Sequence, residues 1–117
     1  MSEAEYTKYM ASQCIVREAA SLLKDNHTKQ GSFPASSEQF SELIALNKER
    51  FMCGPYSRIV DNGLSLDSFG EPVQYISGGE FVVVYTTNTP PSIREGQPFA
   101  LKVTEKVIQE TRIGNSK

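Results

Sequence analysis

The sequence contains few residues that could bind a metal ion: two cysteines, Cys14 and Cys53, and a single histidine, His27. A zinc or iron–sulfur site needs more ligands than these three side chains supply. Two interpretations of the cysteines stay open. In an oxidising compartment they could pair and tie the N-terminal region to the middle of the chain, or they are two buried or half-buried thiols that pack as small hydrophobic groups. The sequence favours the two thiols, and we expect no metal or other cofactor.

Residues that could perform catalysis are equally sparse. His27 stands in a polar stretch beside Asp25, which is typical of a solvated histidine and not of a general base with an oriented nucleophile. Ser36 is followed three residues later by Gln39, so its hydroxyl is better explained as a helix cap than as a nucleophile. The sequence has no paired carboxylates at a defined spacing, no Ser-His-Asp pattern and no phosphate-binding loop. We therefore expect a protein that is not an enzyme.

The composition indicates one small soluble domain. A chain of 117 residues can bury a real, though small, core without metals or several disulfides. The formal net charge is −2, and Lys and Arg are scattered singly, so no basic stripe is available for nucleic acid or for a membrane surface. No run approaches the ~18 apolar residues of a membrane span, and residues 1–10 lack a signal-peptide pattern. We expect a soluble chain with no nucleic-acid partner.

Two helices are expected in the first half of the chain. Apolar residues recur at three- and four-residue steps over residues 3–24, and Asp25-Asn26 reads as a stop signal before a polar loop at 27–32. A second helix is expected to begin at Ser36 or Ser37 and to end at about Asn47, with a capping box at its start. Residues 48–66 read as irregular, with a possible short strand at 58–60.

The second half of the chain predicts strands. Residues 73–76 and 81–85 are β-prone runs separated by Ser-Gly-Gly-Glu, which is the chemistry of a tight hairpin, and a turn segment at 67–72 leads into them. A third strand is expected at 99–103, and residues 104–113 either extend it or form a short helix. The expected fold is α+β: a long N-terminal helix packed on a small antiparallel sheet, with a short second helix. Because both faces of the 81–85 run are apolar, this run is expected to be a central strand.

Three segments resemble a known family. A Gly-Ser-Phe-Pro segment at 31–34, a Gly-Pro-Tyr segment at 54–56 and a segment from Asp67 to Tyr75 follow one another in the order found in the globular domain of type II secretion pseudopilins, especially the major one. The family's last segment reads roughly Asp-Pro-Trp-Gly-x-Pro-x-x-Tyr. The similarity covers about residues 15–85. The motif residues, for which the resemblance implies a structural role, are Gly54, Pro55, Tyr56, Asp67, Phe69, Gly70, Pro72 and Tyr75.

The resemblance implies a pilin-like domain that spans residues 1–117, with a helical stem at 1–25 and the second helix, loop and sheet at 26–117. It implies a structural subunit of a pseudopilus or related filament at the cell envelope, on the periplasmic face of the inner membrane if a hydrophobic helix precedes it. The expected partners are other pseudopilin or pilin-like subunits and secretion-system components. The alternative is a soluble, non-enzymatic protein-binding module on the same fold.

The chain departs from the family at two places. Pseudopilins begin with a hydrophobic helix, whereas residues 1–13 are polar here, so either a hydrophobic half has been removed or the protein is a naturally soluble relative. Major pseudopilins usually carry a calcium-binding loop after the hairpin, whereas residues 86–97 supply only Glu95 as a carboxylate. We expect a monomer that does not respond to calcium.

Overall fold

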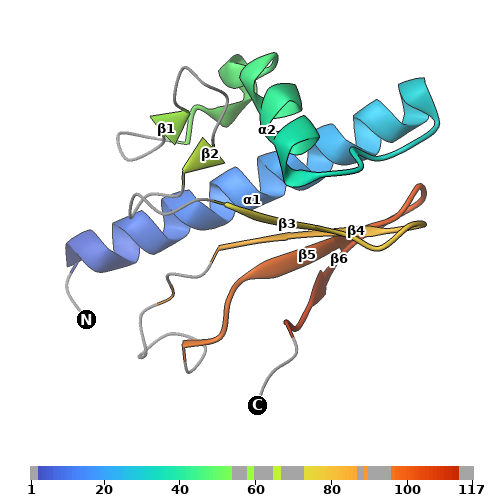
Figure 1. Ribbon diagram of the computed structural model, residues 1–117. Helices are drawn as coiled ribbons and strands as arrows, with labels where there is room; N and C mark the ends of the chain where they lie inside the picture. The colour runs from blue at the N-terminus through green and yellow to red at the C-terminus, as the bar shows by residue number, and fades with distance from the viewer. Residues whose placement is uncertain are drawn as a thin grey trace.

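The computed structural model describes residues 3–53, 58–59, 65–66, 73–86, 89 and 96–113. The long helix α1 (Glu3–Gln30) lies across one face of a four-stranded sheet, and the second helix α2 (Ser37–Ala45) lies on the same side (Figure 1). This confirms the expected α+β class. The remaining described elements are the 3-10 helix η1 (Lys48–Phe51) and the strands β1 (Arg58–Ile59), β2 (Ser65–Leu66), β3 (Gln74–Ser77), β4 (Val82–Tyr85), β5 (Ala100–Val103) and β6 (Ile108–Thr111).

Helix α1 continues six residues beyond the expected end at Lys24. The stop signal at Asp25-Asn26 was therefore a wrong prediction, and so was most of the loop at 27–32. The helix ends at Gln30, and the next residue, Gly31, has a φ of 80° and donates its N–H to the carbonyl of His27 at 2.8 Å. A glycine in this left-handed conformation satisfies a free carbonyl at a helix C-terminus. Asp25 and Asn26 are tolerated inside the helix at a small cost in helix propensity. The left-handed conformation at Gly31 is incompatible with further helix, so Gly31 sets the end.

Helix α2 begins as the capping box predicts. The hydroxyl of Ser36 accepts the N–H of Gln39 at 3.1 Å, and Gln39 Oε1 in turn accepts the N–H of Ala35 at 2.9 Å. The helix ends at Ala45, two residues earlier than expected, because Asn47 folds back on it. Its Nδ2 donates to the carbonyl of Leu43 at 2.9 Å, and the chain then enters η1.

The strands form an antiparallel meander in the order β3-β4-β5-β6. The predicted hairpin is confirmed: Gly78 donates its N–H to the carbonyl of Phe81 at 2.8 Å, and Gly79 occupies the turn with a φ of 89°. The third predicted strand is confirmed as β5. A further pair, β1 with β2, includes the strand considered at 58–60 and adds one at 65–66 that was not expected.

Strand β6 corrects both expectations for residues 104–113, which neither extend the third strand nor form a helix. Thr104 reverses the chain: its Oγ1 accepts the N–H of Lys106 at 3.3 Å and that of Val107 at 3.1 Å. Its own N–H donates to the carbonyl of Val107 at 2.9 Å. A threonine side chain that binds backbone amides just downstream is a known way to make a turn, and here it creates a second hairpin.

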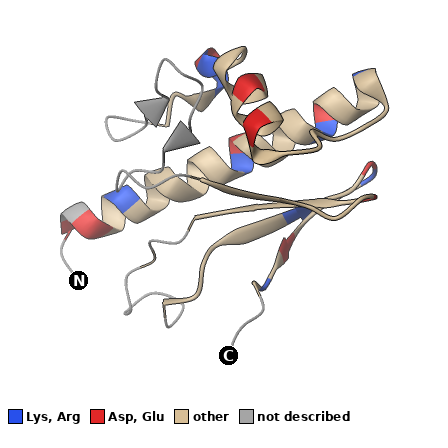
Figure 2. Cartoon of the chain, in the orientation of Figure 1, with Lys and Arg blue, Asp and Glu red and all other residues tan. Residues whose placement is uncertain are grey.

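The core lies between α1 and the sheet. Val82 and Val84 are fully buried on the helix side of β4, where Val84 lies opposite Tyr75 on β3 and Leu101 on β5. Val83 points to the other side and is nevertheless buried. Strand β4 is thus the central strand that the sequence predicted, and neither β3 nor β4 contains a charged residue, whereas α1 carries both signs (Figure 2). The α1 side chains that are buried in this core are Ile15, Val16, Ala19, Ala20, Leu22 and Leu23.

Candidate functional site

Tyr75 is the one residue of the pseudopilin-like motif that the structure describes. Its ring is buried and stacks on Phe40 of α2, with 4.5 Å between ring centroids and 5° between ring planes. Its hydroxyl donates to the carbonyl of Pro34 at 2.6 Å. Burial raises the pKa of the Tyr75 phenol well above its usual value. The other motif residues lie outside the described part of the chain: Gly54, Pro55, Tyr56, Asp67, Phe69, Gly70 and Pro72.

The Tyr75 contacts join two of the three segments that carry the resemblance. Pro34 ends the Gly-Ser-Phe-Pro segment, and Tyr75 closes the last segment 41 residues later. The Tyr75 ring also links both segments to α2 through Phe40, and the backbone carbonyl of Tyr75 accepts a hydrogen bond from the Ser37 hydroxyl of α2 at 3.5 Å. A buried phenol that donates to a backbone carbonyl and stacks on a ring holds the packing of these segments together.

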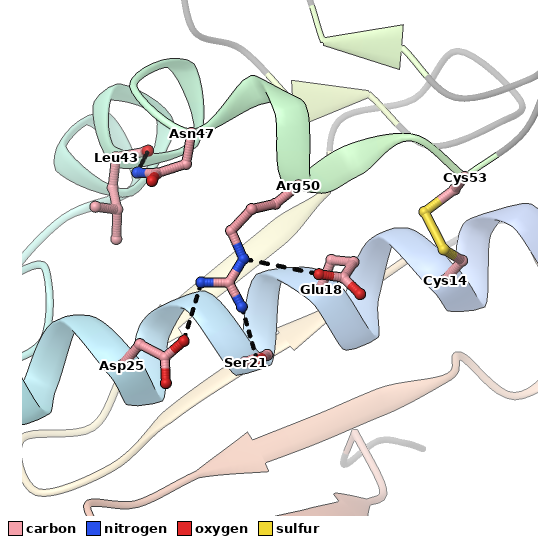
Figure 3. Close-up of polar contacts among 8 residues, drawn as sticks. All are labelled: Cys14, Glu18, Ser21, Asp25, Leu43, Asn47, Arg50 and Cys53. Atoms are coloured by element: carbon pink, nitrogen blue, oxygen red, sulfur yellow. Dashed lines mark hydrogen bonds and ion pairs between the residues drawn. A yellow bond between two sulfur atoms is a disulfide. The ribbon is translucent and has the colours of Figure 1, made fainter.

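A second set of polar contacts fastens the 46–53 segment, which contains η1, to α1 (Figure 3). The guanidinium of Arg50 donates from Nη1 to Asp25 Oδ2 at 3.0 Å and from Nη2 to Ser21 Oγ at 2.9 Å. Its Nε lies 3.8 Å from Glu18 Oε1. One arginine thus contacts three side chains on two successive turns of the helix. These contacts use the several N–H donors of the planar guanidinium, which a lysine does not have.

The two cysteines extend this attachment. Cys14 and Cys53 form a disulfide, with 5.8 Å between their Cα atoms. The favoured interpretation as two separate thiols was therefore wrong, and the pairing that had been left open is confirmed. Figure 3 places the disulfide on α1 one turn before Glu18. We call Cys14, Glu18, Ser21 and Asp25 the α1 stripe, because steps of four, three and four residues put them on one face of the helix.

Sequence reasoning missed the Arg50 cluster. The only sequence pattern that points to it is the spacing of Glu18, Ser21 and Asp25. This spacing predicts a polar face on α1, but it does not predict which residue binds there. The partner comes from a segment that was expected to be irregular, 25 residues beyond Asp25 in the chain.

A cleft of about 850 Å³ opens where the end of α1 meets the turns of both hairpins. On one wall the His27 ring lies 4.4 Å from the Phe33 ring, and on the other the Lys102 ammonium lies 4.6 Å from the centroid of Phe81. Glu80 also lines the cleft. Aromatic faces beside charges of both signs suit contact with a polypeptide side chain. Within the described residues, no group of three or more His, Cys, Asp or Glu side chains is placed to hold a metal ion.

None of the described helices has the apolar length that a bilayer crossing requires. No protein-family model, curated protein or solved structure matches this chain.

Proposed function

We propose that this chain is the globular domain of a structural subunit in a pilus-like filament at the cell envelope, of the kind formed by type II secretion pseudopilins. One observation carries the proposal: α1 packs on the sheet through its middle turns, at residues 15–23, while its first turns reach beyond the strands (Figure 1). There, Tyr6 is 50% exposed and Met10 is 41% exposed. Tyr9 and Ala11 on the same turns are buried, so Tyr6 and Met10 form a small, partly exposed apolar contact that a neighbouring subunit could cover.

The Tyr75 contacts give independent support. If two turn-rich segments resembled the pseudopilin sequence only by chance, they would not need to contact each other in the fold. Here the hydroxyl of Tyr75 binds the carbonyl of Pro34 directly, so the likeness corresponds to one contiguous structural unit between α1, α2 and the hairpin.

The disulfide supports the proposed location. Disulfides form and persist in oxidising compartments such as the bacterial periplasm, and they are rare in reduced cytosol. A covalent link between Cys14 and Cys53 therefore suits a domain on the periplasmic side of the inner membrane. The partners would be other pilin-like subunits and the secretion components that assemble them.

A chimaera tests the proposal. An apolar segment of about 20 residues, long enough to span a bilayer, is fused in helical register ahead of Glu3 and expressed in a bacterium that assembles a type II pseudopilus. We expect the chain to enter filaments that can be sheared from the cells and detected with an antibody. The matched control carries the same segment joined through a Pro-Gly break, which interrupts the helix and should leave the chain membrane-held but outside filaments.

Surface variants sharpen the test. Tyr6→Glu and Met10→Glu in the continuous chimaera should reduce incorporation into filaments without changing the urea midpoint of the domain, because both side chains are exposed. Leu46→Glu is the control for adding a charge at an exposed apolar position on another element. If the continuous chimaera stays out of filaments, or if the Tyr6 and Met10 variants enter as well as the parent, the proposal is wrong.

The cleft favours a second candidate, a protein-binding module on the same fold. The Phe81–Lys102 and His27–Phe33 pairs place aromatic rings and a cation along the cleft, where a partner's side chain could bind. The two candidates differ in what the gene encodes upstream of Met1. An apolar helix in frame favours the filament subunit, and its absence from the gene favours the binding module.

A further inference from the structure

The 46–53 segment is held on α1 by two attachments of different chemistry. At one end the Cys14–Cys53 disulfide is covalent, and in the middle Arg50 is bound by Glu18, Ser21 and Asp25. Both attachments use the α1 stripe (Figure 3). A segment that is fastened twice to one helix face moves only if both attachments fail.

The two attachments respond to different conditions. About 28% of the Arg50 side chain is exposed, as are 40% of Glu18 and 57% of Asp25, so added salt weakens these ion pairs. Salt has no such effect on a disulfide. The buried ring of Phe51 is a third contact, but Leu46 at the end of α2 and Met52 at the end of η1 are exposed and add little burial.

We propose that the disulfide and the Arg50 cluster together form a redox-dependent latch, meaning a pair of attachments that holds the 46–53 segment on α1. When the disulfide is formed, the position of this segment does not depend on ionic strength. In the reduced protein the Arg50 cluster and the buried Phe51 ring remain as contacts of the segment, and the segment leaves α1 when salt screens the guanidinium. The switching step is thiol–disulfide exchange with a dithiol. The Sγ–Sγ bond breaks, Cys14 and Cys53 gain two electrons and two protons, and the dithiol becomes a disulfide.

The latch goes beyond the proposed filament role and does not depend on it. In an oxidising compartment the 46–53 segment stays on α1 at any ionic strength, and in a reducing one its position depends on salt. Since the measurement uses the isolated chain in solution, failure of the latch and failure of filament entry are separate results.

Hydrogen exchange of two amides reports on the segment. The N–H of Arg50 donates to the carbonyl of Asn47 at 3.0 Å, and that of Cys53 donates to the carbonyl of Phe51 at 3.0 Å. Exchange is followed by NMR in oxidised protein and in protein reduced with dithiothreitol, at about 20 mM and about 0.5 M NaCl, where the Debye length falls from roughly 20 Å to roughly 4 Å. Amides of β4 serve as the internal reference for global unfolding.

We expect slow exchange in the oxidised protein at both salt concentrations. After reduction, exchange of both amides should stay slow at low salt and become about fivefold faster at high salt, as the loss of an exposed ion pair predicts. Raising the salt concentration should leave the β4 amides of the reduced protein unchanged, whereas reduction itself should speed their exchange because it lowers the global stability. The variant with Cys14→Ser and Cys53→Ser should behave as the reduced protein without any reductant.

Arg50→Gln separates the two attachments. In the oxidised variant, exchange of the segment amides should stay slow at both salt concentrations. After reduction, it should be fast at both. The control Lys29→Gln removes an exposed charge elsewhere on α1 and should match the parent. The inference is overturned if the reduced protein stays protected at high salt, since Phe51 then suffices. It is also overturned if the segment amides of the reduced protein already exchange as fast at low salt as at high salt, or if added salt accelerates the β4 amides of the reduced protein together with the segment.

Discussion

Tyr75 shows how one buried hydroxyl can make stability depend on pH. Because burial raises the pKa of this phenol, the folded protein favours its neutral form. Up to about pH 10, the usual value for tyrosine, both states are neutral and the contribution is fully present. Above that pH only the unfolded chain ionises at Tyr75, so stability falls by about 1.4 kcal/mol per pH unit.

We predict that Tyr75→Phe removes this part of the alkaline loss. At neutral pH the variant should be less stable by about 1–3 kcal/mol, because the Pro34 carbonyl loses its donor. With rising pH the gap between variant and parent should then narrow, as measured by urea unfolding at about pH 8 and about pH 11. The exposed Tyr6→Phe is the control, and a gap that does not change with pH would contradict the prediction.

Gly78 is required for a different reason, which is the space that a side chain would occupy. A Cβ at this position would lie 2.6 Å from the Phe81 ring, which is itself covered by the Lys102 ammonium. We predict that Gly78→Ala costs about 1 kcal/mol or more, as overpacking does. In a Phe81→Ala background the same change should cost much less, so a double-mutant cycle measured by urea unfolding should give a coupling energy clearly different from zero.

At the scale of elements, the end of α1 depends on Gly31. Its φ of 80° is a conformation that a side chain disfavours, although nothing would contact a Cβ there. We predict that Gly31→Ala destabilises the domain by about 1 kcal/mol through the backbone alone, and that Gly31→Asn costs less because asparagine tolerates this region. Circular dichroism during urea unfolding measures both. Equal stability of all three proteins would mean that the helix ends without the glycine.

The elements that the sequence predicted correctly are those whose signals are local. The hairpin follows from Gly-Gly between two β-prone runs, and the start of α2 follows from Ser36 and Gln39, which are three residues apart. At the end of α1 the sequence offers two stop signals, Asp25-Asn26 and Gly31, and the helix ends at the glycine. Strand β6 was missed because one hydroxyl, that of Thr104, decides the turn before it.

The attachments of the 46–53 segment were beyond local reasoning. A disulfide between cysteines 39 residues apart and an arginine bound by three side chains of α1 exist only once the chain has folded. Neither partner choice is encoded in spacing along the sequence. For the pseudopilin-like motif, the structure shows the contact between Tyr75 and Pro34, while the role that the resemblance implies for the motif residues stays a prediction.

For the whole molecule, the disulfide should contribute a large part of the stability. Closing a loop between residues 39 apart removes conformational entropy from the unfolded chain worth about 4 kcal/mol in the chain-entropy model. We predict that the variant with Cys14→Ser and Cys53→Ser still folds but loses most of this amount, measured as the difference in unfolding free energy from urea titrations. A loss below about 1 kcal/mol would show that the reduced chain retains structure around these residues when unfolded.

Finally, we predict that the chain is mainly monomeric in solution. The large exposed apolar side chains in the described part of the molecule are dispersed over α1, the end of α2, the end of η1, β3 and the second hairpin turn; they are Tyr6, Met10, Leu46, Met52, Ile76 and Val107. Single exposed apolar residues are normal on monomers, whereas a stable interface buries roughly 1,200–2,000 Å² with a continuous apolar centre.

Sedimentation at high micromolar concentration measures this directly. If the chain is a filament subunit, its contacts outside the filament should be weak, so the sedimentation coefficient should change little with concentration and with salt. Adding the apolar segment ahead of Glu3 should be what converts the monomer into an assembling form, because that segment supplies the contact area that the globular domain lacks. A tight and discrete dimer of the chain alone would count against the filament subunit and favour the soluble protein-binding module.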